Sequence, residues 1–338
     1  MNYKPTYIIF GILVCFILGA TFFVHNNGEV VIKAEAANYS FSFNGELYTV
    51  DSTGKTKKLT NSKDVKYVFG ESDELILFGK NYTAQNNHSN GMSLFVMKKG
   101  NGEAKKVTSE IVEFALLDTA KKNILFLTPD GKIKKQGLGN GNTEVVAELA
   151  SIPSISPDDK FLAFKKMPQG WVSGAYSEGS PGIVIKEIAT GKERVLADKE
   201  ADHAAFWTPD GKYLYFFGDN GFGFDSLFIV NNDGTERTLL TNIGLSEYNP
   251  EVVIPSISEP PIISNDGRFF VYESDREIWL VETDLKNKKV IAARRIAYGI
   301  SPRWKKDSEL ISIVAGGDML KDELSMILVD MYGNLISQ

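Results

Sequence analysis

The 338-residue chain has one cysteine and three histidines. A single cysteine, Cys15, cannot form an intrachain disulfide, so burial and hydrogen bonding must stabilise the fold. The histidines, His25, His88 and His203, are scattered, which argues against a transition-metal centre built on several imidazoles. A Ser-His-Asp hydrolase would have to recruit one of the last two, and no G-x-S-x-G motif is present. We therefore expect no catalytic residues, no metal and no cofactor.

Positive charge is also scarce. The formal net charge is −6, with 37 Lys and Arg residues against 43 Asp and Glu residues. Binding nucleic acid through a broad basic face needs an excess of cations, so we expect no nucleic-acid partner. Hydrophobic residues make up 43% of the chain and charged residues 24%, a composition typical of a folded protein rather than a disordered one.

The N-terminal segment is apolar. Residues Ile8 to Val24 carry no charge over 17 residues, which predicts a transmembrane helix of the shorter kind. Lys4 is the only charged residue ahead of this run, which favours a cytoplasmic N-terminus and export of the rest. The small-x-small sequence Ala34-Glu35-Ala36 leaves the alternative of a cleaved secretion signal. We therefore assign residues 1–25 to a membrane anchor or signal, with residues 8–24 contacting the membrane.

One phrase recurs in the rest of the chain. "SPDDKFLAF" (Ser156 to Phe164), "TPDGKYLYF" (Thr208 to Phe216) and "SNDGRFFVY" (Ser264 to Tyr272) each combine a polar turn with an apolar, aromatic strand. Pro presets a turn angle, Asp and Asn bond to the backbone two residues on, and Gly accepts a positive φ. Each phrase therefore predicts a tight turn that leads into a buried strand.

A second strand-like phrase follows each turn at a short distance. Its seven copies start at intervals of 39 to 51 residues, at Glu46, Ser93, Lys132, Gly182, Ser226, Glu277 and Ser325. After most copies come a turn and another short strand, so one period holds about four antiparallel strands. Four strands in a period of this length are typical of a β-propeller blade. The fold class we expect is all-β, a β-propeller of four-stranded antiparallel blades preceded by one N-terminal transmembrane helix.

These phrases, with "LFIV"-type strands and a terminal "LLT", resemble the repeat of the TolB-like propellers, also called the WD40-like Asp-repeat. The resemblance covers Asn38 to Gln338 and is sharp in three or four blades. "TPDG" at Thr128 departs from it, because it follows a strand and must lie at a different hairpin of its blade. The resemblance implies a propeller but little about function, since related propellers are scaffolds, partner-binding proteins and enzymes. The oligogalacturonate-lyase type relies on several histidines for its metal, a pattern absent here.

The number of blades depends on the N-terminal part. Six turn–strand units run from Val65 onward, and "YSFSF" (Tyr39 to Phe43) begins a further unit of three or four strands. We predict seven blades, the alternative being six with a stray hairpin. Residues 26–37 are then a linker or, through Glu29 to Ala34, the innermost strand of the first blade. Residues 38–338 form the propeller domain.

The acidic residues of the turns are Asp158, Asp159, Asp210 and Asp266. We interpret them as turn residues that bond the local backbone rather than as metal ligands. Asp219 and Asp225 flank a glycine-rich loop, which leaves a calcium site as an alternative to a simple blade loop.

Aromatic residues in long loops indicate a binding face. Trp171 and Tyr176 stand in the insertion "MPQGWVSGAYSEGSPG", and Phe222 and Phe224 stand in the corresponding loop of the next blade. Loops at equivalent positions of neighbouring blades lie side by side, so these four residues are our candidate ligand- or partner-binding site. The alternative is that they fold back and cap the apolar ring.

Two functions remain. The first is an extracytoplasmic, membrane-anchored scaffold that binds an envelope protein, peptide or glycan without catalysis. The second is an exported enzyme that acts on polysaccharide or phosphoester through acidic residues, with calcium near Asp219 and Asp225.

Overall fold

The computed structural model describes residues 39–51, 55–81, 91–100, 103–138, 141–151, 153–170, 179–198, 203–219, 225–242, 261–274, 276–305, 310–318 and 323–337. It also describes the backbone of two short strands, β1 (Phe22–Val24) and β2 (Val30–Ile32). Within these ranges, the side chains of residues 203, 219, 225, 241–242, 316–318, 323–325 and 337 are outside the description.

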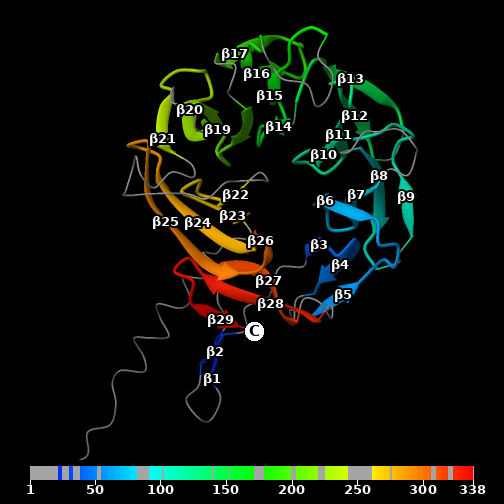
Figure 1. The fold of residues 1–338 in the computed structure, drawn as a ribbon, viewed down its shortest axis with the longest axis vertical. Coiled ribbons are helices and arrows are strands. Elements are labelled where there is room, and N and C mark those ends of the chain that lie inside the picture. The colour runs from blue at the N-terminus through cyan, green and yellow to red at the C-terminus, as the bar shows by residue number, and fades with distance from the viewer. Residues whose placement is uncertain are drawn as a thin grey trace, which may run out of the picture.

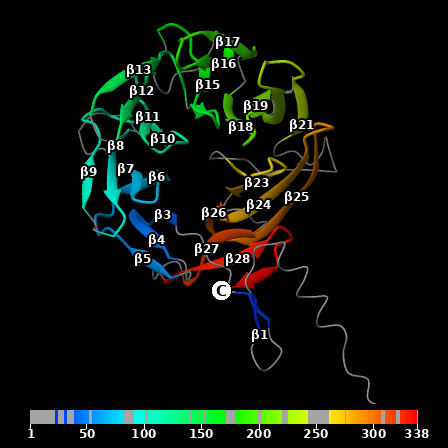
Figure 2. The same ribbon diagram turned by 180° about the vertical axis from the view of Figure 1, so that it is seen from behind.

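Seven small antiparallel sheets stand around a common centre as the blades of a propeller (Figure 1, Figure 2). The first blade has three strands, β3 (Tyr39–Phe43), β4 (Glu46–Val50) and β5 (Thr56–Lys58). Blade 2 contains β6 (Val65–Glu71), β7 (Leu75–Asn81), β8 (Met92–Lys98) and β9 (Ala104–Lys106). Blade 3 contains β10 (Phe114–Leu117), β11 (Asn123–Leu127), β12 (Ile133–Gly137) and β13 (Thr143–Ala147). Blade 4 contains β14 (Ser154–Ile155), β15 (Phe161–Lys166), β16 (Gly182–Glu187) and β17 (Glu193–Ala197).

The remaining three blades also have four strands each. Blade 5 contains β18 (His203–Trp207), β19 (Tyr213–Asp219), β20 (Asp225–Asn231) and β21 (Thr238–Asn242). Blade 6 contains β22 (Ile262–Ile263), β23 (Phe269–Ser274), β24 (Glu277–Asp284) and β25 (Lys289–Tyr298). Blade 7 contains β26 (Ile300–Trp304), β27 (Leu310–Asp318), β28 (Glu323–Asp330) and β29 (Leu335–Ser337). The prediction of seven blades is confirmed, and in six of them the period holds four strands.

The repeated turns begin the second strand of their blades through side-chain hydrogen bonds. In blade 5 the Thr208 hydroxyl donates to the Asp210 carboxylate (2.7 Å) and accepts from the Tyr213 amide (3.1 Å). The same carboxylate accepts from the Lys212 amide at 3.0 Å, and Gly211 supplies the positive φ of 68°. Ser156 with Asp158 and Ser264 with Asp266 form the equivalent bonds in blades 4 and 6.

The core consists of seven apolar clusters, one between each pair of neighbouring blades. The ring closes through the cluster between blades 1 and 7, where Tyr39 and Phe41 pack against Ile300 and Val314. Blades 1 and 7 share no strand in the described part of the chain. Packing of side chains therefore holds the two ends of the ring together.

The N-terminal region differs from the expectation in two respects. The predicted helix at residues 8–24 falls mostly outside the described residues, but its last three, Phe22–Val24, form strand β1, as suits aromatic and β-branched residues. No helix in the described ranges is long and apolar enough to cross a membrane. Strand β2, at the site of the expected innermost strand, pairs with β1 instead of with the first blade, and this hairpin lies outside the ring (Figure 1, Figure 2).

Candidate functional site

The four predicted aromatic site residues, Trp171, Tyr176, Phe222 and Phe224, lie outside the described residues. The strands that carry their loops are described. Residues 167–181 join β15 to β16 and residues 220–224 join β19 to β20, so both loops connect the second and third strands of adjacent blades. They therefore leave the ring at the same end, which we call the loop end. The tight turns between first and second strands lie at the other end, the turn end.

Three of the four turn carboxylates, those of Asp158, Asp210 and Asp266, bond the local backbone as predicted, and Asp159 differs. Asp159 takes the place of the turn glycine, with a positive φ of 58°. Its carboxylate accepts hydrogen bonds from the backbone amides of Thr119 (2.7 Å) and Ala120 (3.1 Å), which belong to the turn of the preceding blade. Asp159 thus joins blades 3 and 4, a role that sequence reasoning missed because the two turns are 40 residues apart.

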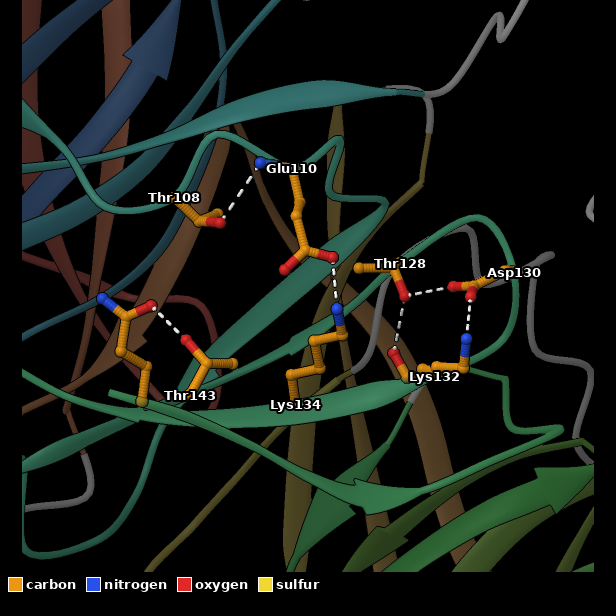
Figure 3. Close-up of polar contacts among 8 residues, drawn as sticks. Thr108, Glu110, Thr128, Asp130, Lys132, Lys134 and Thr143 are labelled. Atoms are coloured by element: carbon orange, nitrogen blue, oxygen red, sulfur yellow. Dashed lines mark hydrogen bonds and ion pairs between the residues drawn. The ribbon is translucent and has the colours of Figure 1, made fainter. Parts of the chain in front are cut away.

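The "TPDG" copy at Thr128 lies at the hairpin between β11 and β12. As predicted, this position in the blade differs from that of the other copies. Figure 3 shows this hairpin: the Thr128 hydroxyl donates to Asp130 (2.6 Å), Lys132 pairs with Asp130, and Lys134 pairs with Glu110. Burial alone would raise the pKa of Asp130, but bonds from the Lys132 ammonium and the Thr128 hydroxyl lower it. Each charged group in this network has a partner of opposite charge, so the network stabilises the blade and offers no free group to a ligand.

A cavity of about 320 Å³ lies at the turn end, where blades 1, 2, 3 and 7 converge. Its lining residues are Tyr39, Ser40, Val68, Gly70, Glu71, Lys121, Arg303 and Trp304. They come from the start of β3, the end of β6, the first turn of blade 3 and the end of β26. The volume lies at the lower end of the range for ligand pockets. The cavity is at the opposite end of the ring from the aromatic loops.

Two buried hydroxyl groups in this lining have no partner. Tyr39 is 4% exposed and Ser40 is 2% exposed, and neither the phenol oxygen nor the serine Oγ makes a hydrogen bond. Burial raises the pKa of the Tyr39 phenol, with Arg303 opposing and Glu71 assisting the rise. The phenol therefore stays protonated at neutral pH and is available as a donor. Buried polar groups in folded proteins are nearly always bonded, so the two groups indicate a place for a ligand or water.

The charges of the cavity are unequal. The Arg303 guanidinium lies over the Tyr39 ring, 5.9 Å from its centroid, and donates to the carbonyl of Pro302 at 2.9 Å. Among the described residues, no carboxylate forms an ion pair with it. Glu71, the single carboxylate among the described lining residues, is paired with Lys99 at 3.2 Å, and Lys121 donates to the Glu71 carbonyl. The cavity therefore presents an uncompensated cation, which favours an anionic group in a bound ligand.

Two bulged strands frame the cavity. The register of β6 against β7 shifts twice, between Val65 and Tyr67 and between Val68 and Gly70. The register of β26 shifts between Ile300 and Arg303, and Ser301 within this bulge has a φ of 51°. Bulges re-aim side chains and occur often beside functional sites. Both bulged strands contribute lining residues to the cavity.

The third side of the cavity is an incomplete blade. In blades 2 to 7 the second strand is paired on both sides, whereas β3 pairs with β4 alone among the described residues. The edge of β3 that faces the ring centre therefore has no neighbouring strand among the described residues.

Among the described residues, no group of three or more His, Cys, Asp and Glu side chains could hold a metal ion. His203 begins β18 as a strand residue, while His25 and His88 lie outside the described ranges. Asp219 and Asp225 are directly opposed in the ladder between β19 and β20, and their side chains are outside the description. The described cavity offers hydrogen bonds and positive charge, but no pair of carboxylates for acid–base chemistry.

No protein-family model and no curated protein sequence matches the chain. Among solved structures, a manganese complex of oligogalacturonate lyase matches with a TM-score of 0.57 and 13% identity, over 94% of this chain and 83% of that one. The chain has the fold of a seven-bladed β-propeller. The tricorn protease matches this propeller with a TM-score of 0.52 and 13% identity, over 90% of this chain and 33% of that one. TolB from Acinetobacter baumannii has a TM-score of 0.49 and 15% identity, over 88% and 77% of the two chains. At these identities the similarity shows the fold alone.

Proposed function

We propose that this propeller is an exported, membrane-anchored scaffold that binds an envelope protein, peptide or glycan and performs no catalysis. The observation that carries the proposal is the cavity at the turn end, with its two unpartnered hydroxyl groups and its unpaired Arg303. Most glycoside hydrolases use two carboxylates that flank the scissile bond, whereas the described lining has one, already paired with Lys99. The uncharged residues from Ile8 up to strand β1 support export and anchoring.

The test is a capture experiment combined with a turnover assay. Full-length protein in detergent is used as bait for solubilised envelope, and bound proteins and glycans are identified by mass spectrometry. We expect specific capture and unchanged envelope polysaccharides and phosphoesters after prolonged incubation with the protein. New cleavage products would contradict the scaffold. The Trp171→Ala/Tyr176→Ala variant tests whether the loop end contributes, since loss of capture without a change in melting temperature would assign the partner to those residues.

The alternative is an exported enzyme with a calcium site. The observation that favours it is the direct opposition of Asp219 and Asp225 across the ladder of blade 5. A ligand that binds only the native state raises the melting temperature, so this alternative requires a calcium-dependent increase that Asp219→Asn abolishes. The scaffold proposal expects no such increase in excess calcium.

A further inference from the structure

We propose that an extended peptide segment of a partner occupies the cavity, adds an innermost strand to blade 1, whose described part has none, and places a carboxylate against Arg303. This inference rests on the binding function proposed above and specifies its ligand. Three features carry it: an open strand edge, an unpaired cation with two buried donors, and space of suitable size beside both.

The inner edge of β3 carries backbone groups that no described strand pairs, and because Ser40 is only 2% exposed these groups face the cavity rather than bulk solvent. The Leu59 amide donates to the Leu47 carbonyl at 2.7 Å, so the backbone groups of Leu47 face β5 and not β3. Leu47 is opposite Ser42 in the β3–β4 register, and the backbone groups of Ser42 therefore point away from β4. Because these directions alternate from one residue to the next along a strand, the backbone N–H and C=O of Ser40 also point away from β4. Its N–H and C=O lie at the edge beside the cavity, which Ser40 itself lines.

A strand is the ligand that such an edge fits. Peptides that add a strand to an exposed sheet edge gain affinity from backbone hydrogen bonds and specificity from pockets for alternate side chains. A small anion would satisfy Arg303 but leave the N–H and C=O of Ser40 without partners. The cavity of about 320 Å³ accommodates a short segment of chain.

The charge of the site selects the peptide. Arg303 has no carboxylate partner in the described residues, and the Tyr39 phenol and Ser40 hydroxyl are buried donors without acceptors. A carboxylate, from Asp, Glu or a chain terminus, accepts from a guanidinium and from hydroxyl groups at once. We therefore expect an acidic residue in the segment that enters the cavity.

The test is selection of random heptapeptides displayed on phage against full-length protein in detergent. The selected peptides are then synthesised, and their dissociation constants are measured with four proteins: wild type, Arg303→Met, Ser40→Pro and Ser40→Ala. A proline at position 40 removes the edge N–H and obstructs the edge, but leaves the β3–β4 ladder intact because that N–H does not bond to β4. Lys160→Met, in an exposed turn at the same end of the ring, is the control for the change in net charge.

We expect the selected peptides to contain an acidic residue. They should bind at least ten-fold more weakly to Arg303→Met and to Ser40→Pro than to the wild type, and Ser40→Ala should weaken binding less than Ser40→Pro. Replacing the acidic residue of the peptide by its amide should weaken binding to the wild type as much as Arg303→Met does. The same replacement should cause no further loss of affinity for Arg303→Met. Thermal melts followed by circular dichroism identify any variant that fails to fold. In that case the comparison of acid and amide peptides with the wild type tests the proposal by itself. Selection of no peptides, or of peptides indifferent to the amide and to both variants, would overturn the strand proposal. Indifferent peptides would leave the scaffold function standing with its site elsewhere.

Discussion

At the scale of single residues, the repeated turns show what a hydroxyl group contributes. Thr208 is fully buried, and its Oγ1 accepts from the Tyr213 amide at 3.1 Å while donating to Asp210 at 2.7 Å. Ser replaces Thr at the equivalent positions 156 and 264, so the hydroxyl is common to the three turns and the methyl group is not.

Thr208→Val should therefore destabilise the protein by about 1 to 3 kcal/mol, the usual cost of leaving buried polar groups without partners. Thr208→Ser keeps the hydroxyl and should cost less than Thr208→Val. Chemical denaturation of the two variants and the wild type measures both values. A larger loss for Thr208→Ser than for Thr208→Val would show that the methyl contact, and not the hydrogen bonds, determines the stability of the turn.

At the scale of single elements, the hairpin between β3 and β4 holds the first blade in place. Asn44 and Gly45 have φ values of 47° and 78°, the pattern of the tight turn that Asn-Gly sequences favour. A Cβ atom built on Gly45 would lie 2.6 Å from the carbonyl oxygen of Lys63, which is too close for any side chain. The hairpin therefore needs glycine for conformation and for space.

Gly45→Ala should cost about 2 to 4 kcal/mol, because backbone strain and a steric clash add together. The matched control is Gly191→Ala, at a turn glycine with a φ of 71° and only the end of the Lys186 side chain within 4 Å. That variant should cost about 1 kcal/mol, from strain alone. Similar losses of stability in the two variants would contradict the clash at Lys63.

The elements also show what sequence could and could not predict. The seven copies of the strand phrase gave the number of blades, and turn chemistry placed "TPDG" at Thr128 on a different hairpin, because both signals are local. The pairing of β2 with β1, the link from Asp159 to blade 3 and the cavity were not predicted. Tyr39, Glu71 and Arg303 meet only when the ring closes, so no short stretch of sequence contains the site.

At the scale of the whole molecule, the described part of the ring closes without a strand shared between its first and last blades. Phe41 at the closure is 1% exposed and stacks on Tyr48 at a centroid distance of 5.4 Å. Phe216, in the cluster between blades 4 and 5, is fully buried and stacks on Phe228 at 5.3 Å. If packing closes the ring as firmly as it joins the other blades, truncating Phe41 or Phe216 should destabilise the protein by a similar amount.

Phe41→Ala and Phe216→Ala should each cost about 3 to 5 kcal/mol and keep a single unfolding transition. Calorimetry of both variants measures the loss of stability and the number of unfolding transitions. An early, separate transition in Phe41→Ala alone would mean that the closure is weaker than the other blade interfaces.

The central claim is that blade 1 has an open inner edge beside the cavity. Hydrogen exchange of the full-length protein, resolved to single amides, tests this claim without a ligand. The amides of Ser40 and Ser42 should exchange much faster than that of Phe41, which faces β4, and faster than those of β7, which is paired on both sides. Slow exchange at Ser40 and Ser42, equal to that of β7, would show that another part of the chain already pairs with this edge and would contradict the account.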